Sequence, residues 1–113
     1  MAFGIMGGWN QSQAHAQFVA NLVDFKMNIQ AAVEASRFSK RTFGGCDVMM
    51  ENRFAQNVRN ELTNKGHKID LKGAYSSAMG GGQVVMRDFA TGVNYGASDP
   101  RKDGQAVAEL PFE

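Results

Sequence analysis

Two adjacent glycines, Gly7 and Gly8, stand between a short apolar run and a segment rich in helix-forming residues. Glycine lets the backbone turn sharply and come close to a bound group. Backbone N–H groups at the start of a helix lack a partner within the helix and favour anions. The pair therefore predicts a site for an oxyanion or a phosphate, with a simple tight turn as the alternative.

Three further side chains could take part in catalysis: His15, Cys46 and His67. Cys46 is the only cysteine, which excludes a disulfide within the chain; we expect a small buried hydrophobe rather than a reactive thiol. His15 is a candidate general base, but a histidine that ties its helix to the sheet by a hydrogen bond is favoured. We interpret His67 as a solvated or capping residue. The histidines and carboxylates lack the spacing of metal ligands, so no metal site is expected.

Composition indicates one globular domain, residues 1–113, with 43% apolar residues to form a core. The formal net charge of +1 gives no sign of attraction to nucleic acid or to a membrane surface. No apolar run is long enough to span a bilayer, and residues 1–5 are too short for a signal peptide. The cellular compartment stays open.

Helical spacing of apolar residues predicts two neighbouring helices, over residues 12–25 and 29–36. Ser12 and Asn28 are the expected N-caps, because both side chains can accept a hydrogen bond from the first turn. The inward stripe of the first helix is expected to hold an alanine, a valine and three larger residues, Phe18, Leu22 and Phe25.

The rest of the chain predicts one more helix and several strands. The helix follows Phe54 and ends before Gly66, which suits a left-handed C-cap. Residues 39–45 are expected to form a loop, with Arg37, Lys40 and Arg41 on a solvated surface. Gly80–Gly82 is either flexible or a close backbone approach. The expected strands are 47–51, 67–71, 83–87, 93–97 and 106–108, and four methionines (Met49, Met50, Met79 and Met86) are expected to fill the core.

This order of elements predicts an α+β fold, with helices packed on one face of a mainly antiparallel sheet. The strands at 83–87 and 93–97 are expected to pair as a hairpin, because the connection between them is short and ends in glycine.

The sequence around the glycine pair resembles the small subunit of γ-glutamyltranspeptidases. The matching stretches occur in the same order and extend over nearly the whole chain. The matching stretches are Met6-Gly-Gly8, Gln11-x-Gln13-x-His15-x-Gln17, Asn21-Leu-Val-Asp-Phe25, Met27-Asn28-x-Gln30-x-Ala32, Ala35-x-Arg37-Phe38, Asn64-Lys-Gly-His67 and Gly96-Ala-Ser-Asp-Pro-Arg-Lys-Asp-Gly104-x-Ala106.

The resemblance implies part of an N-terminal-nucleophile hydrolase fold, a layered sandwich of sheets and helices, and transfer of a γ-glutamyl group to water or an amine. It implies that Gly7 and Gly8 lie at the oxyanion hole, and it implies no cofactor. The expected partners are a γ-glutamyl substrate and either the large subunit with the N-terminal part of the small subunit, or further copies of this chain. The partial sheet would otherwise keep an unpaired edge.

Enzymes of this family use a threonine at the start of the small subunit, well upstream of the glycine pair. Met1 lies only six residues before Gly7, and Thr42, Thr63 and Thr91 stand in no matching context. The chain is therefore expected to be the C-terminal segment of such an enzyme and to be inactive alone. The alternative is a truncated, non-catalytic relative that acts as a binding or assembly module.

Four other residues stand out beside the resemblance. Trp9 departs from the small or polar residue expected after the glycines. It could wall off a substrate carboxylate or favour an aromatic group, or pack against the helix start. Asp99, Arg101 and Gly104 belong to the second strong match and are interpreted as a structural motif that locks the final loop, with contact to the active-site rim as the alternative. Arg101 could pair bidentately with a carboxylate.

Overall fold

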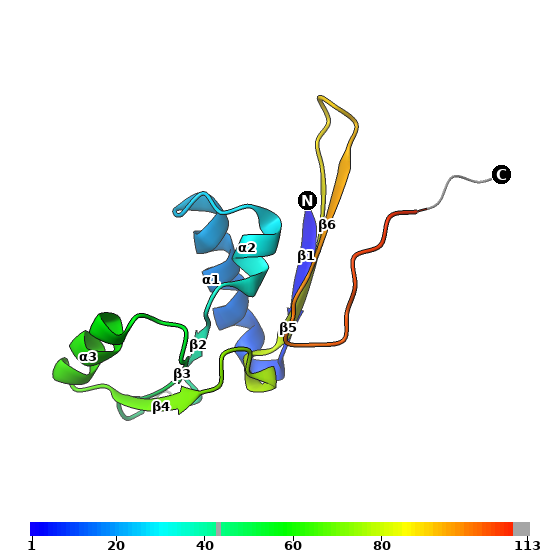
Figure 1. Cartoon of the computed structure of the whole chain (residues 1–113). Helices are drawn as coiled ribbons and strands as arrows, with labels where there is room; N and C mark the ends of the chain where they lie inside the picture. Colours follow the sequence, from blue (N-terminus) through cyan, green and yellow to red (C-terminus); the bar gives the residue numbers. More distant parts are fainter. Residues whose placement is uncertain (43, 110–113) are drawn as a thin grey trace.

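The computed structural model describes residues 1–42 and 44–109, which build two three-stranded sheets with helices between and beside them (Figure 1). The elements are β1 (Ala2–Met6), the 3-10 turn η1 (Gly8–Asn10), α1 (Gln11–Val23), α2 (Ile29–Glu34), β2 (Phe38–Ser39), β3 (Asp47–Glu51), α3 (Gln56–Asn64), β4 (Lys68–Lys72), the 3-10 turn η2 (Ser77–Met79), β5 (Gly81–Arg87) and β6 (Asn94–Ser98). No helix of these residues is long and apolar enough to cross a membrane.

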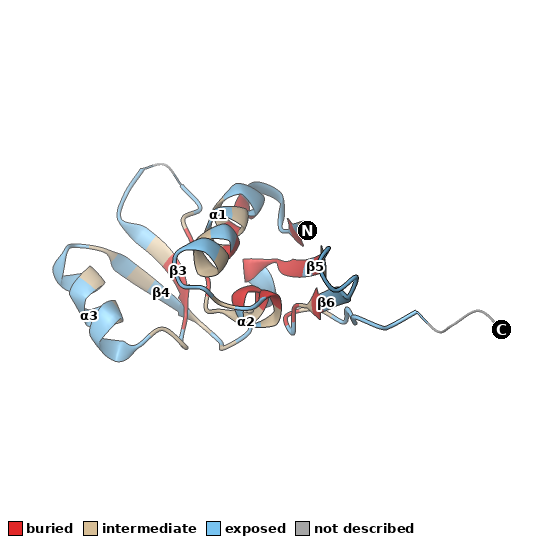
Figure 2. Ribbon diagram, turned by 90° about the horizontal axis from the view of Figure 1, so that it is seen from above, coloured by how far each residue is buried: buried red, intermediate tan, exposed pale blue. Residues whose placement is uncertain are grey.

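The first sheet has the order β1-β5-β6 and is antiparallel throughout. Helices α1 and α2 cover one face of it, and the buried residues concentrate between these layers (Figure 2). Successive side chains of a strand point to opposite faces of the sheet, so every second residue of each strand faces the helices and can join the core. The core consists of Ile5, Ala14, Phe18, Ile29, Ala32, Val33, Val84 and Ala97.

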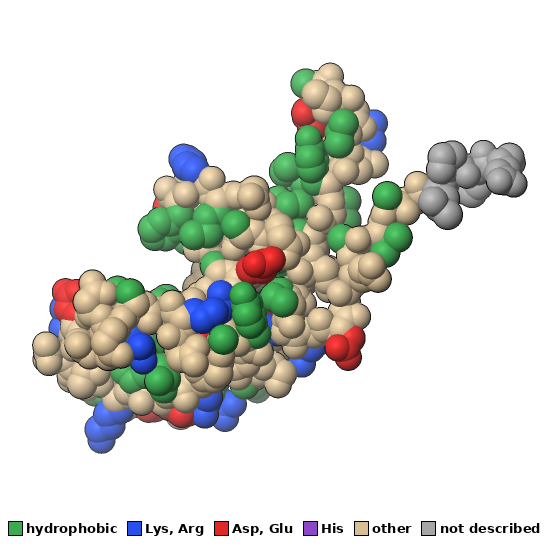
Figure 3. Space-filling view, viewed as in Figure 1, with side chains coloured by type: hydrophobic (Ala, Val, Ile, Leu, Met, Phe, Trp, Pro, Cys, Tyr) green, Lys and Arg blue, Asp and Glu red, His purple; other side chains and the backbone are tan. Residues whose placement is uncertain are grey.

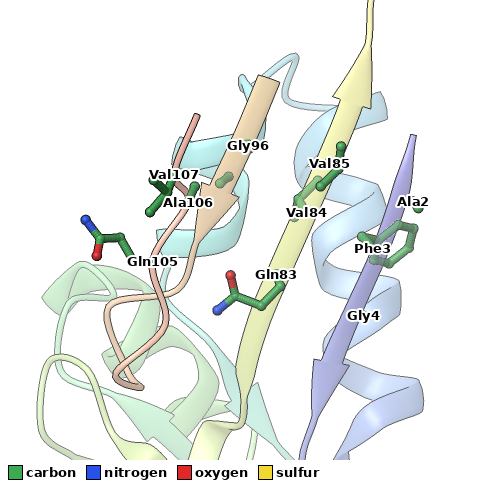
Figure 4. A pocket seen from close by; sticks show the side chains of 11 residues that line it. Ala2, Phe3, Gly4, Gln83, Val84, Val85, Gly96, Gln105, Ala106 and Val107 are labelled. Carbon is green, nitrogen blue, oxygen red and sulfur yellow. The ribbon is translucent and has the colours of Figure 1, made fainter. Parts of the chain in front are cut away.

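The other face of this sheet is largely open. Gln83 and Val85 flank buried Val84 along β5 and are exposed. The segment from Gln105 to Val107 lies beside this face, with Ala106 next to Gly96, and together they border a pocket of about 480 Å³ (Figure 4).

The second sheet has the order β2-β3-β4. Strands β2 and β3 are antiparallel, whereas β3 and β4 are parallel and are connected through α3. The expected α+β class with mainly antiparallel pairing is thus confirmed, but the strands form two small sheets. Helix α3 buries none of its residues, so it packs loosely beside β4.

The two N-terminal helices lie close to their predicted ranges. Asn28 caps α2 as expected, because its Oδ1 accepts a hydrogen bond from the Ala31 N–H at 2.8 Å. Ser12 does not cap α1, which begins one residue earlier, with Asn10 at the N-cap. Phe25 was wrongly assigned to the buried stripe. It follows the end of α1 and is 70% exposed, while Phe18 fills the core.

The strand predictions hold where pairing is local. The strand 47–51 and the hairpin of β5 and β6 are confirmed. Ser39 was wrongly placed in a loop, since it is buried in β2; Phe43, within the same predicted loop, lies outside the described residues. Residues 106–108 were wrongly predicted as a strand. Gly66 takes the expected left-handed conformation after α3, with φ 93°.

Candidate functional site

Gly7 and Gly8 form the turn between β1 and the helical segment. Their φ angles are 146° and 56°, a region that side chains disfavour. The Gly7 carbonyl oxygen accepts a hydrogen bond from the Asn10 N–H at 3.0 Å. Among the described residues, neither glycine N–H donates to a backbone carbonyl in the loop and cap hydrogen bonds. The turn thus presents two N–H donors at the start of a helix, as an anion site requires.

The glycine turn packs closely against a second glycine segment. A Cβ on Gly7 would lie 3.4 Å from the Asn10 Cβ and 3.6 Å from the Gly80 Cα. Gly80 itself has φ 83°, and a side chain there would collide with the Met6 carbonyl oxygen. Of the two interpretations of Gly80–Gly82, close backbone approach is therefore confirmed.

A cavity of about 360 Å³ opens beside the glycine turn. Trp9, directly after the turn, borders this cavity and a neighbouring one of about 590 Å³. Its side chain is 98% exposed, so it does not pack against the helix start. The first cavity is lined by Gly7, Gly8, Trp9, Asn10, Gln13, Ser39, Lys40, Arg41, Met49 and Ala78.

His15 joins α1 to β1, as favoured from the sequence. The Ile5 N–H donates a hydrogen bond to His15 Nε2 at 2.9 Å, and the ring meets Phe3 edge-on. This nitrogen is used as a backbone acceptor, so His15 positions the strand that leads into the glycine turn rather than serving as a base.

Two glutamines of α1 hold the outer edge of β2. Gln13 donates to the Lys40 carbonyl at 2.9 Å and accepts from the Lys40 N–H at 2.8 Å. Gln17 does the same with Phe38, at 2.9 and 3.0 Å. Each amide thus pairs with both backbone groups of one residue, like a neighbouring strand. Sequence reasoning missed these pairs, although the shared helix face of the two glutamines was a signal for them.

Asn10 lies one turn before Gln13 and differs from it in having no partner. Its residue is 8% exposed, and both Nδ2 and Oδ1 are buried without a hydrogen bond among the described residues. Native proteins pair nearly all such atoms, so an unpaired amide beside the glycine turn requires an explanation.

Comparison with known proteins identifies the family. The family model of gamma-glutamyltranspeptidase matches residues 1–109. The chain belongs to the gamma-glutamyltranspeptidase family. Among curated relatives, the glutathione hydrolase-like YwrD proenzyme of Bacillus subtilis is 31% identical over 93% of this chain. The glutathione hydrolase proenzyme of Escherichia coli is 34% identical over 87% of it.

Solved structures agree with this assignment. The cephalosporin acylase from Bacillus halodurans superposes with a TM-score of 0.86 at 39% identity, over 97% of this chain and 20% of that one. The Bacillus anthracis transpeptidase CapD superposes with a TM-score of 0.77 at 26% identity, over 95% of this chain and 62% of that one. The chain spans about a fifth of the length of the curated relatives, 20% of the first and 16% of the second named above.

The Asp99–Arg101 motif of this chain forms a buried charge cluster. Arg101 pairs bidentately with Glu51, with Nε–Oε1 at 2.8 Å and Nη2–Oε2 at 2.6 Å, as predicted for a carboxylate partner. It also contacts Asp99 at 3.0 Å. Burial disfavours the charge of Arg101, but the hydrogen bond to Glu51 and the charge of Asp99 outweigh it and raise the pKa of Arg101.

Arg37 belongs to the same cluster, although it was predicted on the surface. It pairs with Asp99 at 2.7 Å and donates to the Met79 carbonyl at 3.2 Å. Burial, followed by the positive charge of Arg101, lowers the pKa of Arg37. Asp99 in turn accepts the Gly82 N–H at 3.0 Å. The cluster therefore holds the segment that packs under the glycine turn.

The remaining candidates lie outside this site. Cys46 is exposed, so the expectation of a buried hydrophobe was wrong. The His67 N–H closes α3 on the Leu62 carbonyl at 3.1 Å, as expected of a capping residue, while its Nδ1 is buried without a partner among the described residues. Gly104 lies against the Gln83 amide, where a side chain would collide. Within the described part of the chain, no group of three His, Cys, Asp or Glu residues could hold a metal.

Proposed function

We propose that this chain is the segment of a γ-glutamyltranspeptidase-like hydrolase that supplies the oxyanion hole, through the N–H groups of Gly7 and Gly8. The observation that carries the proposal is the turn with two open N–H donors beside a cavity. The family match and the glutathione hydrolases among the relatives support a γ-glutamyl amide as the substrate.

The proposed reaction uses a threonine supplied from outside this chain. Its hydroxyl oxygen attacks the γ-carbonyl carbon, and its proton passes to the amino group of the same threonine. The carbonyl oxygen becomes negative and is stabilised by the two glycine N–H groups. The C–N bond then breaks, the leaving amine takes the proton, and a γ-glutamyl-threonine ester remains. Water or a second amine attacks this ester, which releases the product and restores the hydroxyl.

The glycine role can be tested by removing one N–H without changing a side chain. Because Cys46 follows Gly45, a synthetic segment 1–45 can be ligated to a recombinant segment 46–113. In the synthetic segment an ester oxygen replaces the Gly8 nitrogen. With the upstream part of the protein supplied, turnover of a γ-glutamyl p-nitroanilide is expected to fall about 10²- to 10³-fold in kcat.

The control is the ligated chain with every amide intact. An ester variant with unchanged kcat would exclude the oxyanion role of Gly8. Turnover by the isolated chain would contradict an external nucleophile. If the gene upstream of Met1 begins with a stop codon and no upstream part exists, the non-catalytic binding module becomes the better proposal.

A further inference from the structure

We infer that the side-chain amide of Asn10 is a docking point for an extended main-chain segment of the same protein, from the part that lies outside this chain. The inference rests on the proposed function only in that the chain belongs to a larger enzyme. It does not depend on the substrate.

One type of contact recurs in this chain: a side-chain amide that pairs with both backbone groups of one extended residue. Gln13 and Gln17 each hold the N–H and the C=O of one extended residue, Lys40 and Phe38. Gln30 of α2 holds both backbone groups of Ser98 in the same way, at 3.0 and 3.2 Å. A carboxamide that offers one donor and one acceptor side by side suits the backbone of an extended residue.

Asn10 lies on the same helix face as the two glutamines of α1. Asn10 has helical backbone angles, φ −76° and ψ −15°, so it precedes Gln13 and Gln17 along one helix face. It borders the same cavity as Gln13 and Lys40. Its donor and its acceptor are both buried and unpaired, which is unfavourable unless a partner arrives.

Among the described residues, the chain that follows β2 does not supply a backbone partner to Asn10. The Gln17 and Gln13 pairs use residues 38 and 40, so the next residue in this alternation is Thr42. The chain turns away there. The Thr42 hydroxyl donates to the Gly44 carbonyl at 2.7 Å, and the Lys40 ammonium pairs with Asp47 at 3.1 Å. Strand β2 thus supplies no backbone group to Asn10, and a segment that pairs with this amide has to enter through the cavity that Asn10 borders.

The two unpaired atoms of Asn10 favour extended main chain over a small anion as their partner. A small anion would use donors only, whereas Asn10 leaves an acceptor unpaired as well. Extended main chain satisfies both atoms, as it does for the two glutamines. The chain spans about a fifth of its curated relatives, so most of the main chain of such an enzyme lies elsewhere.

The test compares Asn10→Leu with Asn60→Leu, the same substitution at an exposed position of α3. Leucine has a similar size but no polar atom. In the chain alone, Asn10→Leu is expected to unfold at the same or a higher urea concentration than the unaltered chain, because it removes an unpaired amide. Its association with the upstream part, measured by titration calorimetry, is expected to weaken about 5- to 150-fold. Asn60→Leu should associate normally.

Three outcomes would overturn the inference. A lower unfolding midpoint for Asn10→Leu would mean that the amide has a partner within the chain. Unchanged association would exclude docking. Unchanged association with a raised KM for a γ-glutamyl peptide would identify the substrate as the partner instead.

A second measurement does not depend on a variant. The Asn10 side-chain NH₂ protons, followed by NMR, are expected to move downfield and to exchange more slowly when the upstream part binds. Unchanged signals in the complex would overturn the inference. Asn10-dependent association without turnover of any γ-glutamyl anilide would contradict the proposed activity alone, and the reverse result would contradict docking alone.

Discussion

The Arg101 side chain connects elements that lie far apart in the chain. It donates to Glu51 of β3 and to Asp99, and also to the backbone carbonyls of Val33 and Ala35 at 3.1 and 2.8 Å. Both charged partners have fully buried side chains. Buried ions of this kind are tolerated only when each is paired and hydrogen-bonded.

Removing this guanidinium is expected to destabilise the chain strongly. Arg101→Met removes the bidentate partner of Glu51 and one of the two arginines paired with Asp99, so the free energy of unfolding should fall by about 3–5 kcal/mol. The control is Lys65→Met, which breaks the exposed pair with Glu61 at 3.4 Å and should change the value by about 0.5 kcal/mol or less. Urea unfolding measures both. Equal losses in the two variants would contradict the assignment of a buried cluster.

Trp9 offers a direct optical test, because it is the only tryptophan. Its side chain is 98% exposed, so the isolated chain should emit at the long wavelength of an indole in water. If the proposed upstream part binds beside the cavity, the emission should shift to shorter wavelength. Acrylamide quenching gives a second reading, with strong quenching expected before association and weaker quenching after it. Blue-shifted emission from the isolated chain would contradict the exposed position.

For single residues, the sequence predicted those contacts that follow from the chemistry of the side chain. A histidine that joins helix to strand and an arginine paired with a carboxylate were both foreseen, for His15 and Arg101. Arg37 was missed because it lies close in sequence to the basic Lys40-Arg41 pair, while its actual partner, Asp99, comes near the other end of the chain. Asn10 was missed because an unpaired amide is visible only once its surroundings are known.

Among the elements, the β5–β6 hairpin is the one whose geometry is most clearly local. The Asp88 carboxylate accepts hydrogen bonds from the Thr91 hydroxyl at 2.7 Å and the Ala90 N–H at 2.9 Å. The bond from Thr91, followed by that from Ala90, lowers the pKa of Asp88. A depressed carboxyl pKa means that the turn is stabilised above the ordinary pKa of aspartate, and that this contribution is lost as the pH falls.

Removing the Thr91 hydroxyl should therefore change the titration of its neighbour. In Thr91→Val, the pKa of Asp88 is expected to rise toward the ordinary value, as followed by NMR of the carboxyl carbon. The matched control is Thr63→Val on α3, which should leave the Asp88 titration as it is. Identical curves in Thr91→Val and the unaltered chain would show that the hydroxyl contributes nothing.

Elements with local partners were predictable, and those with distant partners were not. The hairpin and the strand at 47–51 follow from alternation and turn residues. Strand β1 was not predicted, because only pairing with β5, far along the chain, makes the short apolar run a strand. Residues 106–108 show the opposite error: their side chains suit a strand, but the segment pairs with none of the described strands.

The whole molecule is more extended than its length requires. Its radius of gyration is 16.1 Å, whereas a compact domain of this size has about 13 Å. The β5–β6 hairpin projects from the body (Figure 1), and hydrophobic side chains gather along it (Figure 3). The exposed apolar residues there are Val85, Phe89, Val93 and Tyr95. Such a surface is typical of one that another protein part covers.

The exposed sheet face predicts self-association of the isolated chain. Light scattering after size exclusion is expected to give a mass above the 12.3 kDa of one copy at high concentration. Val85→Glu places a charge on this face and should return the mass toward a monomer. Val58→Glu, a similar change at a half-exposed position of α3, should not. A clean monomer for the unaltered chain at high concentration would contradict the prediction.

The register of the first sheet also determines how long β1 stays unpaired during synthesis. Residues 2–6 pair with residues 81–85, so β1 leaves the ribosome some 80 residues before its hydrogen-bonding partner does. At about 5–20 residues per second, its N–H and C=O groups wait roughly 4–16 seconds for that partner. Asp99 and Arg101, which complete the buried charge cluster, emerge later still. During translation the unpaired β1 edge is therefore open to pairing with other chains until residues 81–101 have emerged.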